Sequence, residues 1–323
     1  MDKVDILVPG ALPARSVETL RGLFACHRVE GHVGVDGIAG DVARRIRGIA
    51  RGGHFAVTRA VIDRLPALEI VASFGVGYDG IDLAHCAERG IVVTNTPDVL
   101  TEEVADTALG LLLMTVRELS AAERHLREGR WEKEGTYRLT SATLRNRTVG
   151  IAGLGRIGLA IARRLDAMKV PVVYHTRSPK PGVPYRYYAD LTDMAKAVDT
   201  LVIVLPGTAA TAGIVDAEVL RALGPEGILV NVGRGSVVDE PALIEALRSG
   251  TIQAAGLDVF AEEPHVPAEL IALDNVVLLP HVGSASVFTR DAMGQLMIDN
   301  LESWFASGRP LTPVPETPWP AKG

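Results

Sequence analysis

A glycine-rich segment near the middle of the chain has the sequence VGIAGLGRIG (residues 149–158). Its first four residues form a predicted strand, and the glycine motif Gly153–Gly158 follows that strand and opens a helical pattern, which is the context of a dinucleotide-binding turn. Gly153 permits the tight turn, Gly155 lets the backbone approach a pyrophosphate, and Gly158 lets helix and strand pack closely. The helix start then turns its amide groups toward the anion. The cofactor contacts predicted here are Gly153, Leu154, Gly155, Arg156, Ile157 and Gly158.

Short apolar runs alternate with helical patterns on both sides of this segment, which indicates βαβ units and parallel sheets. Strands are predicted at Asp5–Val8, Ile46–Ala50, Ile70–Phe74, Val92–Asn95, Val149–Ala152, Val172–His175, Thr200–Leu205, Ile228–Asn231, Ala254–Leu257 and Val276–Leu279. Helices are predicted at Arg59–Leu65, Leu83–Glu88, Thr101–Glu128, Arg156–Met168, Asp216–Leu223, Glu240–Ser249 and Asp291–Phe305. The proline-rich tail from Arg309 is expected to run extended over the surface.

Composition places the chain among globular enzymes. It has 323 residues, of which 47% are hydrophobic and 22% charged, so two domains are expected. The net charge of −6 is spread without a basic block, which argues against a nucleic-acid partner. Its two cysteines have no metal-binding or redox spacing, and no metal is expected. No apolar run reaches the roughly 20 residues that a bilayer span needs, so we expect a cytoplasmic protein with no membrane partner.

The strand after the glycine-rich turn ends in VYHTRS (residues 173–178), without the carboxylate that usually binds the ribose 2′-hydroxyl of NAD. Arg177, with the hydroxyls of Thr176 and Ser178, could instead receive a 2′-phosphate, and Lys180 could assist. These residues predict NADP(H) as the preferred cofactor. In the alternative interpretation Arg177 stacks on the adenine and NAD(H) binds.

Three later segments follow strand ends, where open α/β sheets bind ligands: NVGRGS (231–236), DVFAEEP (258–264) and PHVGS (280–284). An arginine can hold a carboxylate and polarise a keto oxygen, and an imidazolium can protonate that oxygen. A carboxylate at the other ring nitrogen orients the imidazole. Arg234, Glu263 and His281 are therefore candidates for hydride chemistry on a carbonyl. Each also has an ordinary structural interpretation, and their joint placement favours the catalytic one.

Together with VLP (204–206), TAG (211–213) and SFGVGYDGID (73–82), these motifs resemble the D-isomer-specific 2-hydroxyacid dehydrogenase family over nearly the whole chain. The segment VVTNTPDVLTEEVAD (92–106) is most similar to the glyoxylate/hydroxypyruvate reductase branch, which commonly uses NADPH.

The resemblance implies a role for each residue that matches a family motif. Arg234 would anchor the 2-oxoacid, His281 would be the acid/base, and Glu263 rather than Glu262 would be its partner, because the family places this carboxylate directly before a proline. The amides of Val76 and Gly77 would hold the acid group. Further cofactor contacts are implied for Leu205, Pro206, Thr211, Val232, Gly233, Asp258, His281 and Gly283, with Asp258 at the nicotinamide carboxamide.

The family fold consists of two Rossmann-like domains, each a doubly wound parallel α/β sheet. It implies a discontinuous, flavodoxin-like substrate domain at residues 1–99 with 285–323, and a dinucleotide-binding domain at 100–284. Family members form homodimers. Trp131 and Tyr137 lie in the stretch that reaches a partner subunit, although a core role is the other interpretation.

Hydroxypyruvate and glyoxylate are the expected substrates. A bulkier 2-oxoacid such as phenylpyruvate or 2-ketogluconate is the alternative. Arg51, His54 and Phe55 follow a strand end and either line the substrate pocket or form a solvated loop. Formate-type family members lack a glutamate beside the histidine, so Glu263 argues against that chemistry. A nucleotide-sensing binding protein of the same fold is the second class of function.

Overall fold

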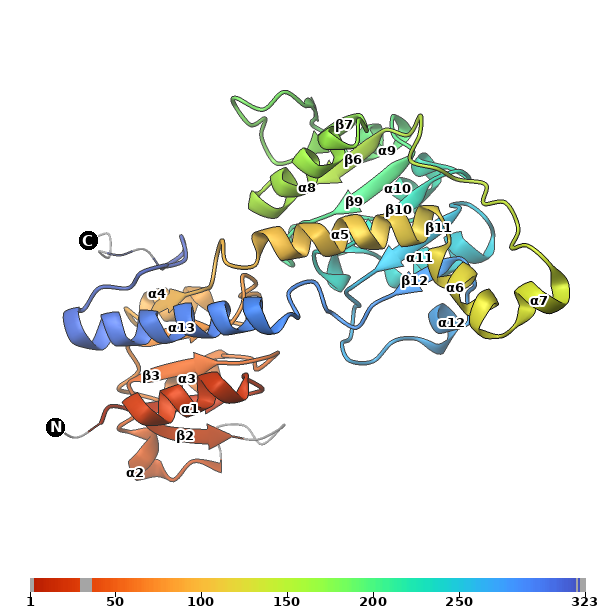
Figure 1. The fold of residues 1–323 in the computed structure, drawn as a ribbon. Coiled ribbons are helices and arrows are strands. Elements are labelled where there is room, and N and C mark those ends of the chain that lie inside the picture. The colour runs from red at the N-terminus through yellow and green to blue at the C-terminus, as the bar shows by residue number, and fades with distance from the viewer. Residues whose placement is uncertain (1–2, 30–36, 318, 320–323) are drawn as a thin grey trace. The chain divides into compact units, whose positions relative to one another are not determined.

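The computed structural model describes residues 3–29, 37–317 and 319. The chain forms two compact units: a terminal unit of Met1–Leu100 with Ser286–Gly323, and a central unit of Thr101–Ala285. Figure 1 shows that each unit is built on one sheet with helices packed against it.

The terminal unit contains a five-stranded sheet in the order β2-β1-β3-β4-β5, with parallel pairing throughout. This is the flavodoxin-like strand order and confirms the predicted fold class. Its strands are β1 (Asp5–Pro9), β2 (Ala25–Val29), β3 (Gly48–Arg51), β4 (Ile70–Ser73) and β5 (Val92–Thr94). Strand β2 was not predicted because it lies at the edge and carries polar residues, so it lacks the continuous apolar pattern of a buried strand.

Among the described residues of the terminal unit, the helices are α1 (Ala14–Leu23), α2 (Gly40–Ala43), α3 (Arg59–Arg64), α4 (Leu83–Glu88) and α13 (Val287–Ser307). Helix α13 is far from the others in sequence. It nevertheless packs on α1, β3 and β4, as Figure 1 shows in blue against red and orange. The terminal unit therefore closes its core only after the central unit has been traversed by the chain.

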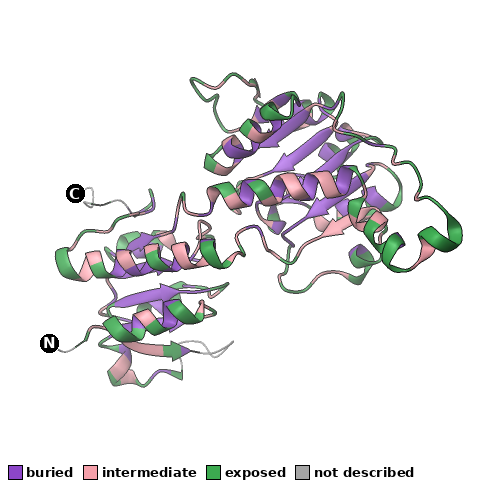
Figure 2. Cartoon of the chain, in the orientation of Figure 1, coloured by how far each residue is buried: buried purple, intermediate pink, exposed green. Residues whose placement is uncertain are grey.

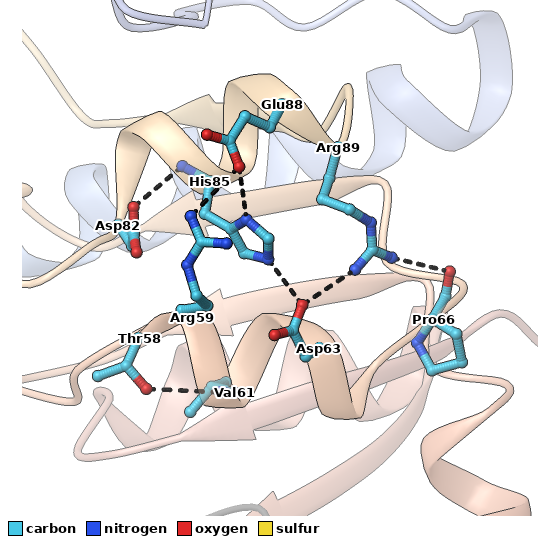
Figure 3. Close-up of polar contacts among 9 residues, drawn as sticks. All are labelled: Thr58, Arg59, Val61, Asp63, Pro66, Asp82, His85, Glu88 and Arg89. Carbon is cyan, nitrogen blue, oxygen red and sulfur yellow. Dashed lines mark hydrogen bonds and ion pairs between the residues drawn. The ribbon is translucent and has the colours of Figure 1, made fainter.

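Helices α3 and α4 are joined by a network of charged side chains (Figure 3). The ring of His85 lies between two carboxylates, with Nε2 2.7 Å from Asp63 and Nδ1 3.0 Å from Glu88. Arg59 pairs with Glu88 at 3.2 Å, and Arg89 lies 3.6 Å from Asp63. Hydrogen bonds first to Glu88 and then to Asp63 raise the pKa of His85 above its ordinary value of 6.5. The network thus stabilises the protonated form of the imidazole.

The proline-rich tail is packed more tightly than predicted. Val314 is buried, and its amide donates to the carbonyl of Val93 at 2.9 Å. The hydroxyl of Thr317 accepts from the amide of Val93 at 2.9 Å. Because β5 is an edge strand, its free backbone groups are available to the tail. Residues 318 and 320–323 lie outside the described chain.

The central unit contains a seven-stranded parallel sheet in the order β12-β11-β10-β9-β6-β7-β8. Its strands are β6 (Val149–Ala152), β7 (Val172–His175), β8 (Arg186–Tyr188), β9 (Thr200–Ile203), β10 (Ile228–Asn231), β11 (Ala254–Leu257) and β12 (Val276–Leu278). The order reverses between β6 and β9, and this switch point is where Rossmann sheets bind dinucleotides. Strand β8 was not predicted, because it is a three-residue edge strand that begins with an exposed arginine.

Helices cover both faces of this sheet. Those of the central unit are α5 (Thr101–Val116), α6 (Leu119–Arg127), α7 (Arg130–Glu134), α8 (Arg156–Ala167), α9 (Leu191–Lys196), α10 (Ala217–Leu223), α11 (Glu240–Arg248) and α12 (Ala268–Ile271), with a short 3-10 helix η2 (Gly235–Val237). Helices α5 and α8 pack together over one apolar cluster, and α9, α10 and α11 cover the other. This is the doubly wound arrangement that was predicted.

The single long helix predicted at Thr101–Glu128 is two helices. Helix α5 ends at Val116 and α6 begins at Leu119, because Glu118 adopts a left-handed backbone conformation with φ 52°. A left-handed residue interrupts the helical hydrogen-bond pattern. The carboxylate of Glu118 accepts a hydrogen bond from the hydroxyl of Tyr137 at 2.9 Å, which ties the break to the following loop.

Figure 2 shows the burial that results within each unit: the inner strands of each sheet are mostly buried, the edge strands β2, β8 and β12 are only partly buried, and the outer faces of the helices are exposed. In the described ranges, no helix combines the length and apolar character needed to cross a bilayer.

Candidate active site

The glycine-rich turn joins β6 to α8 with a geometry that suits a pyrophosphate. Gly153 has φ 102°, and a Cβ there would lie 2.7 Å from the carbonyl oxygen of Val204. A Cβ at Gly158 would lie 2.1 Å from the oxygen of Gly153, so helix and turn are in direct contact. Gly155 is the N-cap residue of α8 and is exposed. In the described chain, no atom beyond its neighbours lies within 4 Å of where its Cβ would be. The residues therefore form an open anion cradle at a helix start, as a dinucleotide requires.

The other predicted contacts of this turn differ in exposure. Leu154 is buried at 2% exposure, Ile157 is half-buried, and Arg156 is exposed at the first turn of α8. Leu154 thus belongs to the apolar core under the turn, whereas Arg156 faces solvent. A guanidinium at this position adds positive charge beside the helix start.

The loop after β7 fits a cofactor that carries a 2′-phosphate. The hydroxyl of Thr176 donates to the carbonyl of Ser178 at 2.7 Å, which curls the loop. Arg177 and Lys180 are exposed, and within the described residues neither cationic group forms a hydrogen bond or ion pair. His175 occupies the place of the usual carboxylate, and its Nδ1 lies 3.1 Å from the carbonyl oxygen of Tyr188. The loop at residues 176–180 therefore carries two cationic side chains and no carboxylate.

Two neighbouring strand ends come into backbone contact beside the turn. A Cβ at Gly233 would lie 2.7 Å from the carbonyl oxygen of Leu205, so the predicted contacts after β9 and β10 are adjacent. Thr211 returns toward the same loop and donates its hydroxyl to the carbonyl of Pro206 at 2.6 Å. Val232 is 8% exposed and lies with the apolar cluster beneath. The structure thus gathers these residues along one edge of the sheet.

Arg234 follows β10 and leads directly into η2. Its Nη1 donates to the carbonyl of Gly233 at 2.8 Å, and the residue is half-buried. A Cβ at Gly235 would lie 1.8 Å from the carbonyl carbon of Phe260, so at this position only glycine fits. This close approach brings Arg234 beside the segment that leads to Glu263.

Glu263 and His281 form a hydrogen-bonded pair. Nδ1 of His281 lies 2.6 Å from Oε2 of Glu263, and the two side chains are 37% and 14% exposed. The other carboxylate oxygen, Oε1, accepts the amide of Phe260 at 3.0 Å. The neighbouring carboxylate, Glu262, is exposed and forms a β-bridge with His265. The structure therefore brings Glu263, and not Glu262, to the imidazole.

Asp258 holds the turn on which His281 lies. Its carboxylate is buried at 2% exposure and accepts the amides of Val282 at 2.7 Å and Gly283 at 2.8 Å. The amide of His281 donates to the Asp258 carbonyl at 2.9 Å. Burial raises the pKa of Asp258, although the two amide hydrogen bonds oppose this shift. Because His281 itself has φ 53°, this set of bonds maintains an otherwise unfavourable backbone conformation.

The predicted substrate residues Val76 and Gly77 lie in the terminal unit, in the loop after β4. Gly75 has φ 129°, and its amide donates to Thr96 at 3.0 Å. The side chain of Asn95 donates to the carbonyl of Val76 at 2.9 Å. Within the described residues, the amides of Val76 and Gly77 have no acceptor. They are therefore available to an anionic ligand.

The loop after β3 contains three residues that were predicted either to line the substrate pocket or to lie in a solvated loop, and their burial differs. Arg51 is 6% exposed, and it donates to the carbonyl of Phe55 at 2.6 Å and to the hydroxyl of Ser73 at 3.0 Å. Phe55 is half-buried against the apolar cluster, and His54 is exposed. Arg51 is thus a buried internal brace of the terminal unit, which excludes a solvated-loop position for it.

For Trp131 and Tyr137, the sequence left open a core role or contact with a partner subunit. Trp131 is 58% exposed on α7, so its core interpretation is wrong: the helix is short and offers no apolar face for the ring to cover. Tyr137 packs edge-on against His125, with ring centroids 5.4 Å apart. Tyr137 is partly buried and packs locally against His125, so its role stays a prediction.

Two residues that support the site were not among the predicted contacts. The side chain of Asn231 donates to the carbonyl of Arg234 at 2.9 Å and accepts from the amide of Gly233 at 3.0 Å, which fixes the turn that carries the arginine. The backbone of Phe260 orients Glu263. The position of Asn231, two residues before Gly233-Arg234-Gly235, could have indicated its supporting role. The contact made by the Phe260 backbone has no sequence signature.

Comparisons with known proteins agree with this geometry. Residues 109–283 match the family model of the D-isomer specific 2-hydroxyacid dehydrogenase NAD binding domain. The chain is 51% identical to glyoxylate/hydroxypyruvate reductase A of Arabidopsis thaliana, over 83% of this chain and 85% of that protein. It is 49% identical to hydroxyphenylpyruvate reductase of Plectranthus scutellarioides, over 84% and 86% of the two chains.

One solved structure is similar over the full length of both chains. It is an NADPH-dependent glyoxylate/hydroxypyruvate reductase of Sinorhizobium meliloti in complex with NADP and malonate, with a TM-score of 0.95 and 55% sequence identity. The dinucleotide turn, the Glu263–His281 pair and these similarities together lead to one assignment. The chain belongs to the D-isomer-specific 2-hydroxyacid dehydrogenase family.

Proposed function

We propose that this protein is an NADPH-dependent reductase that converts small 2-oxoacids, with hydroxypyruvate and glyoxylate favoured, into D-2-hydroxyacids. The observation that carries the proposal is the 2.6 Å contact between Nδ1 of His281 and Glu263 at the carboxyl end of the nucleotide-binding sheet. An imidazole held in this way can act as a general acid through its other nitrogen.

Three residues of the central unit would each have a separate role in the reaction. Bound NADPH would supply the hydride to C2 of the substrate. Nε2 of His281 would donate a proton to the carbonyl oxygen as negative charge develops there. Glu263 would hold the ring and stabilise its protonated form. Arg234 would bind the substrate carboxylate and polarise the keto group, a task that suits its planar set of donors.

We propose that the terminal unit is the substrate domain and that the amides of Val76 and Gly77 bind the acid group. Two observations support this role: Gly75 opens the loop with a positive φ, and neither amide is used within the described residues. Successive free backbone N–H groups form anion-binding sites. An acidic group held at one end of a small substrate would present C2 in a fixed position.

The residues that fit the cofactor support NADP(H) over NAD(H). The anion cradle at Gly155 fits a pyrophosphate, and the loop after β7 offers Arg177 and Lys180 without a carboxylate. A carboxylate at the strand end would repel a 2′-phosphate, whereas an arginine can bind it through two hydrogen bonds. The relative from Sinorhizobium meliloti, which was solved with NADP, gives the same indication.

A bulkier substrate is the second candidate, because the Plectranthus relative is named for hydroxyphenylpyruvate. Steady-state reduction of hydroxypyruvate, glyoxylate and phenylpyruvate, each with NADPH, distinguishes the two. We expect kcat/KM to be highest for one of the two small acids. A higher kcat/KM for phenylpyruvate would keep the mechanism and overturn the substrate assignment. Chiral analysis of the glycerate formed from hydroxypyruvate should show the D-isomer.

We propose that the protein is a homodimer and that the surface around α6 and α7 is its interface. Leu126, Trp131 and Leu139 are 55%, 58% and 95% exposed, and Leu126 and Trp131 line one shallow groove with Gly129. A cluster of exposed large apolar side chains favours burial against a partner. A second copy of the chain is the partner that the family resemblance implies.

A further inference from the structure

Two tyrosines on neighbouring strands support the loop that is proposed to receive the 2′-phosphate. Tyr174 on β7 and Tyr187 on β8 are direct cross-strand partners in the parallel pair. Their ring centroids lie 5.5 Å apart with the planes tilted by 51°. Tyr174 is only 1% exposed, and Tyr187 is half-buried in the same apolar cluster. The two rings therefore form a packed pair near the carboxyl ends of β7 and β8, which we call the tyrosine platform.

Both hydroxyls of this platform bond to the backbone of the loop. The hydroxyl of Tyr187 donates to the carbonyl of Thr176 at 3.2 Å, where the loop begins. The hydroxyl of Tyr174 accepts from the amide of Lys180 at 2.8 Å, where the loop ends. The loop is thus fastened at both ends, and Arg177 lies between the two points.

The sequence of the loop makes the second hydrogen bond specific. Lys180 lies between Pro179 and Pro181, and proline has no amide hydrogen. The amide of Lys180 is therefore the one backbone N–H group in residues 179–181, and the hydroxyl of Tyr174 accepts its hydrogen bond. Because the two prolines also restrict the backbone, this hydrogen bond acts on a segment that has few other conformations.

Resting on the proposed NADP(H) preference, we propose that Tyr174 and Tyr187 are positioning residues that determine how strongly the protein discriminates between cofactors with and without a 2′-phosphate. In this role their hydroxyls bond to the backbone of the loop and do not bind the cofactor directly. They hold the loop so that Arg177 and Lys180 present their charges in one arrangement.

The physical reason is the cost of ordering. An exposed arginine or lysine on a mobile loop loses conformational entropy when it binds an anion, and prior fixing of the backbone reduces that loss. The gain in affinity should concern the 2′-phosphate alone. The proposed pyrophosphate site is the separate glycine-rich turn between β6 and α8, and the two tyrosine hydroxyls do not bond to that turn. Loss of a tyrosine hydroxyl should therefore weaken binding of NADPH and leave binding of NADH unchanged.

The test compares Tyr187→Phe and Tyr174→Phe with a matched control, Tyr185→Phe. Tyr185 precedes β8, and its hydroxyl bonds to Asp166 on α8 at 2.5 Å rather than to the loop. Calorimetric titration would measure the affinity for adenosine 2′,5′-bisphosphate and for adenosine 5′-monophosphate, and steady-state kinetics would measure KM for NADPH and NADH.

For each of the two test variants we expect affinity for the bisphosphate and KM for NADPH to worsen by about three- to tenfold, the usual effect of one neutral hydrogen bond. Affinity for the monophosphate and KM for NADH should stay as in the wild type, and Tyr185→Phe should change none of the four. Equal losses for both nucleotides, or no change in either, would overturn the inference.

The outcome can be separated from failure of the proposed function. If the wild type binds the bisphosphate no better than the monophosphate, the proposed cofactor preference is wrong, and the inference falls with it. If the wild type discriminates and Tyr187→Phe discriminates equally well, the inference alone is wrong. Should the buried Tyr174→Phe fail to fold, the half-buried Tyr187 carries the test.

Discussion

Glu263 engages His281 with one carboxylate oxygen and the protein backbone with the other. Oε2 lies 2.6 Å from Nδ1 of His281, and Oε1 accepts the amide of Phe260 at 3.0 Å. With both oxygens bonded, the carboxylate cannot rotate without losing a hydrogen bond. The imidazole is therefore held by a rigid partner, which is the condition for placing a proton donor accurately.

The histidine of this pair should be essential for reduction. His281→Ala should lower kcat by about 10²-fold or more, the usual size of general acid catalysis. Binding of NADPH should weaken far less than kcat falls, because the glycine-rich turn and Arg177 are untouched. Stopped-flow and steady-state measurements with hydroxypyruvate would give both quantities. A kcat within about threefold of the wild type, well below that usual range, would remove His281 from the role.

Removing the charge of its partner should have a smaller effect. Glu263→Gln keeps the shape of the side chain and removes the charge of the carboxylate that bonds to Nδ1 of His281. We expect kcat to fall by about tenfold while KM for NADPH stays unchanged, because the ring loses the charge-assisted hydrogen bond that orients it. Steady-state kinetics with hydroxypyruvate measure both quantities. A kcat equal to that of the wild type would show that the carboxylate only packs beside the ring.

Arg177 should discriminate between the two cofactors. Arg177→Ala should raise KM for NADPH by about tenfold or more, the range for a charge-assisted hydrogen bond, and leave KM for NADH nearly unchanged. Thr143→Ala, a hydroxyl deletion whose partner is the amide of Arg145, provides an unrelated control in the same unit. Equal increases for both cofactors would mean that the guanidinium stacks on the adenine instead.

The charged network of Figure 3 should make the stability of the terminal unit depend on pH. Its hydrogen bonds raise the pKa of His85, so this contribution is complete below 6.5 and is lost as pH rises through the folded-state value. The same bonds lower the pKa of Asp63 and Glu88, so their contribution is lost as pH falls below their ordinary values of 3.8 and 4.5. Stability should therefore be greatest between these limits.

His85→Gln tests that window by denaturant unfolding across pH. We expect the variant to be less stable than the wild type near pH 6, with the difference shrinking above the folded-state pKa of His85. High salt should weaken the effect, because the two carboxylates are 54% and 60% exposed. His27→Gln, which removes a histidine bonded to the single carboxylate of Asp5, is the control. A difference that is constant over pH would contradict an ionic role.

The proposed interface can be tested by placing a charge on it. Trp131→Glu should convert the dimer to monomers in sedimentation experiments, because a carboxylate buried at an apolar interface has no partner there. Ile271→Glu changes an equally exposed apolar residue on α12, with 60% exposure against 58%, and should leave the dimer intact. If both variants remain dimeric, the interface lies elsewhere on the chain.

The fold was predictable where a strand is buried along its whole length and therefore has a continuous run of apolar residues. The strands that carry the site, β6, β10 and β11, are buried at every residue, and their predicted bounds match the observed ones. Edge strands β2 and β8 were missed because an edge strand needs no apolar run. The break at Glu118 was missed because a left-handed glutamate has no sequence signature, unlike a glycine.

The sequence was sufficient to predict which side chains lie at the site, but not the contacts that hold them in place. The motifs indicated which side chains lie at the strand ends, and the parallel sheet explains why those ends gather. The roles assigned to Arg234, Val76 and Gly77 stay predictions. The contacts that hold the site in place, such as Asp258 with two backbone amides, depend on loop geometry that sequence spacing does not encode.

The most direct test of the account is the oxidation of NADPH and of NADH by the wild-type protein in the presence of hydroxypyruvate, followed at the nicotinamide absorbance. We predict rapid turnover with NADPH, slower turnover with NADH, and D-glycerate as the product. Tight nucleotide binding without turnover, for this acid and for glyoxylate and phenylpyruvate, would contradict the account and indicate a nucleotide-sensing protein built on the same fold.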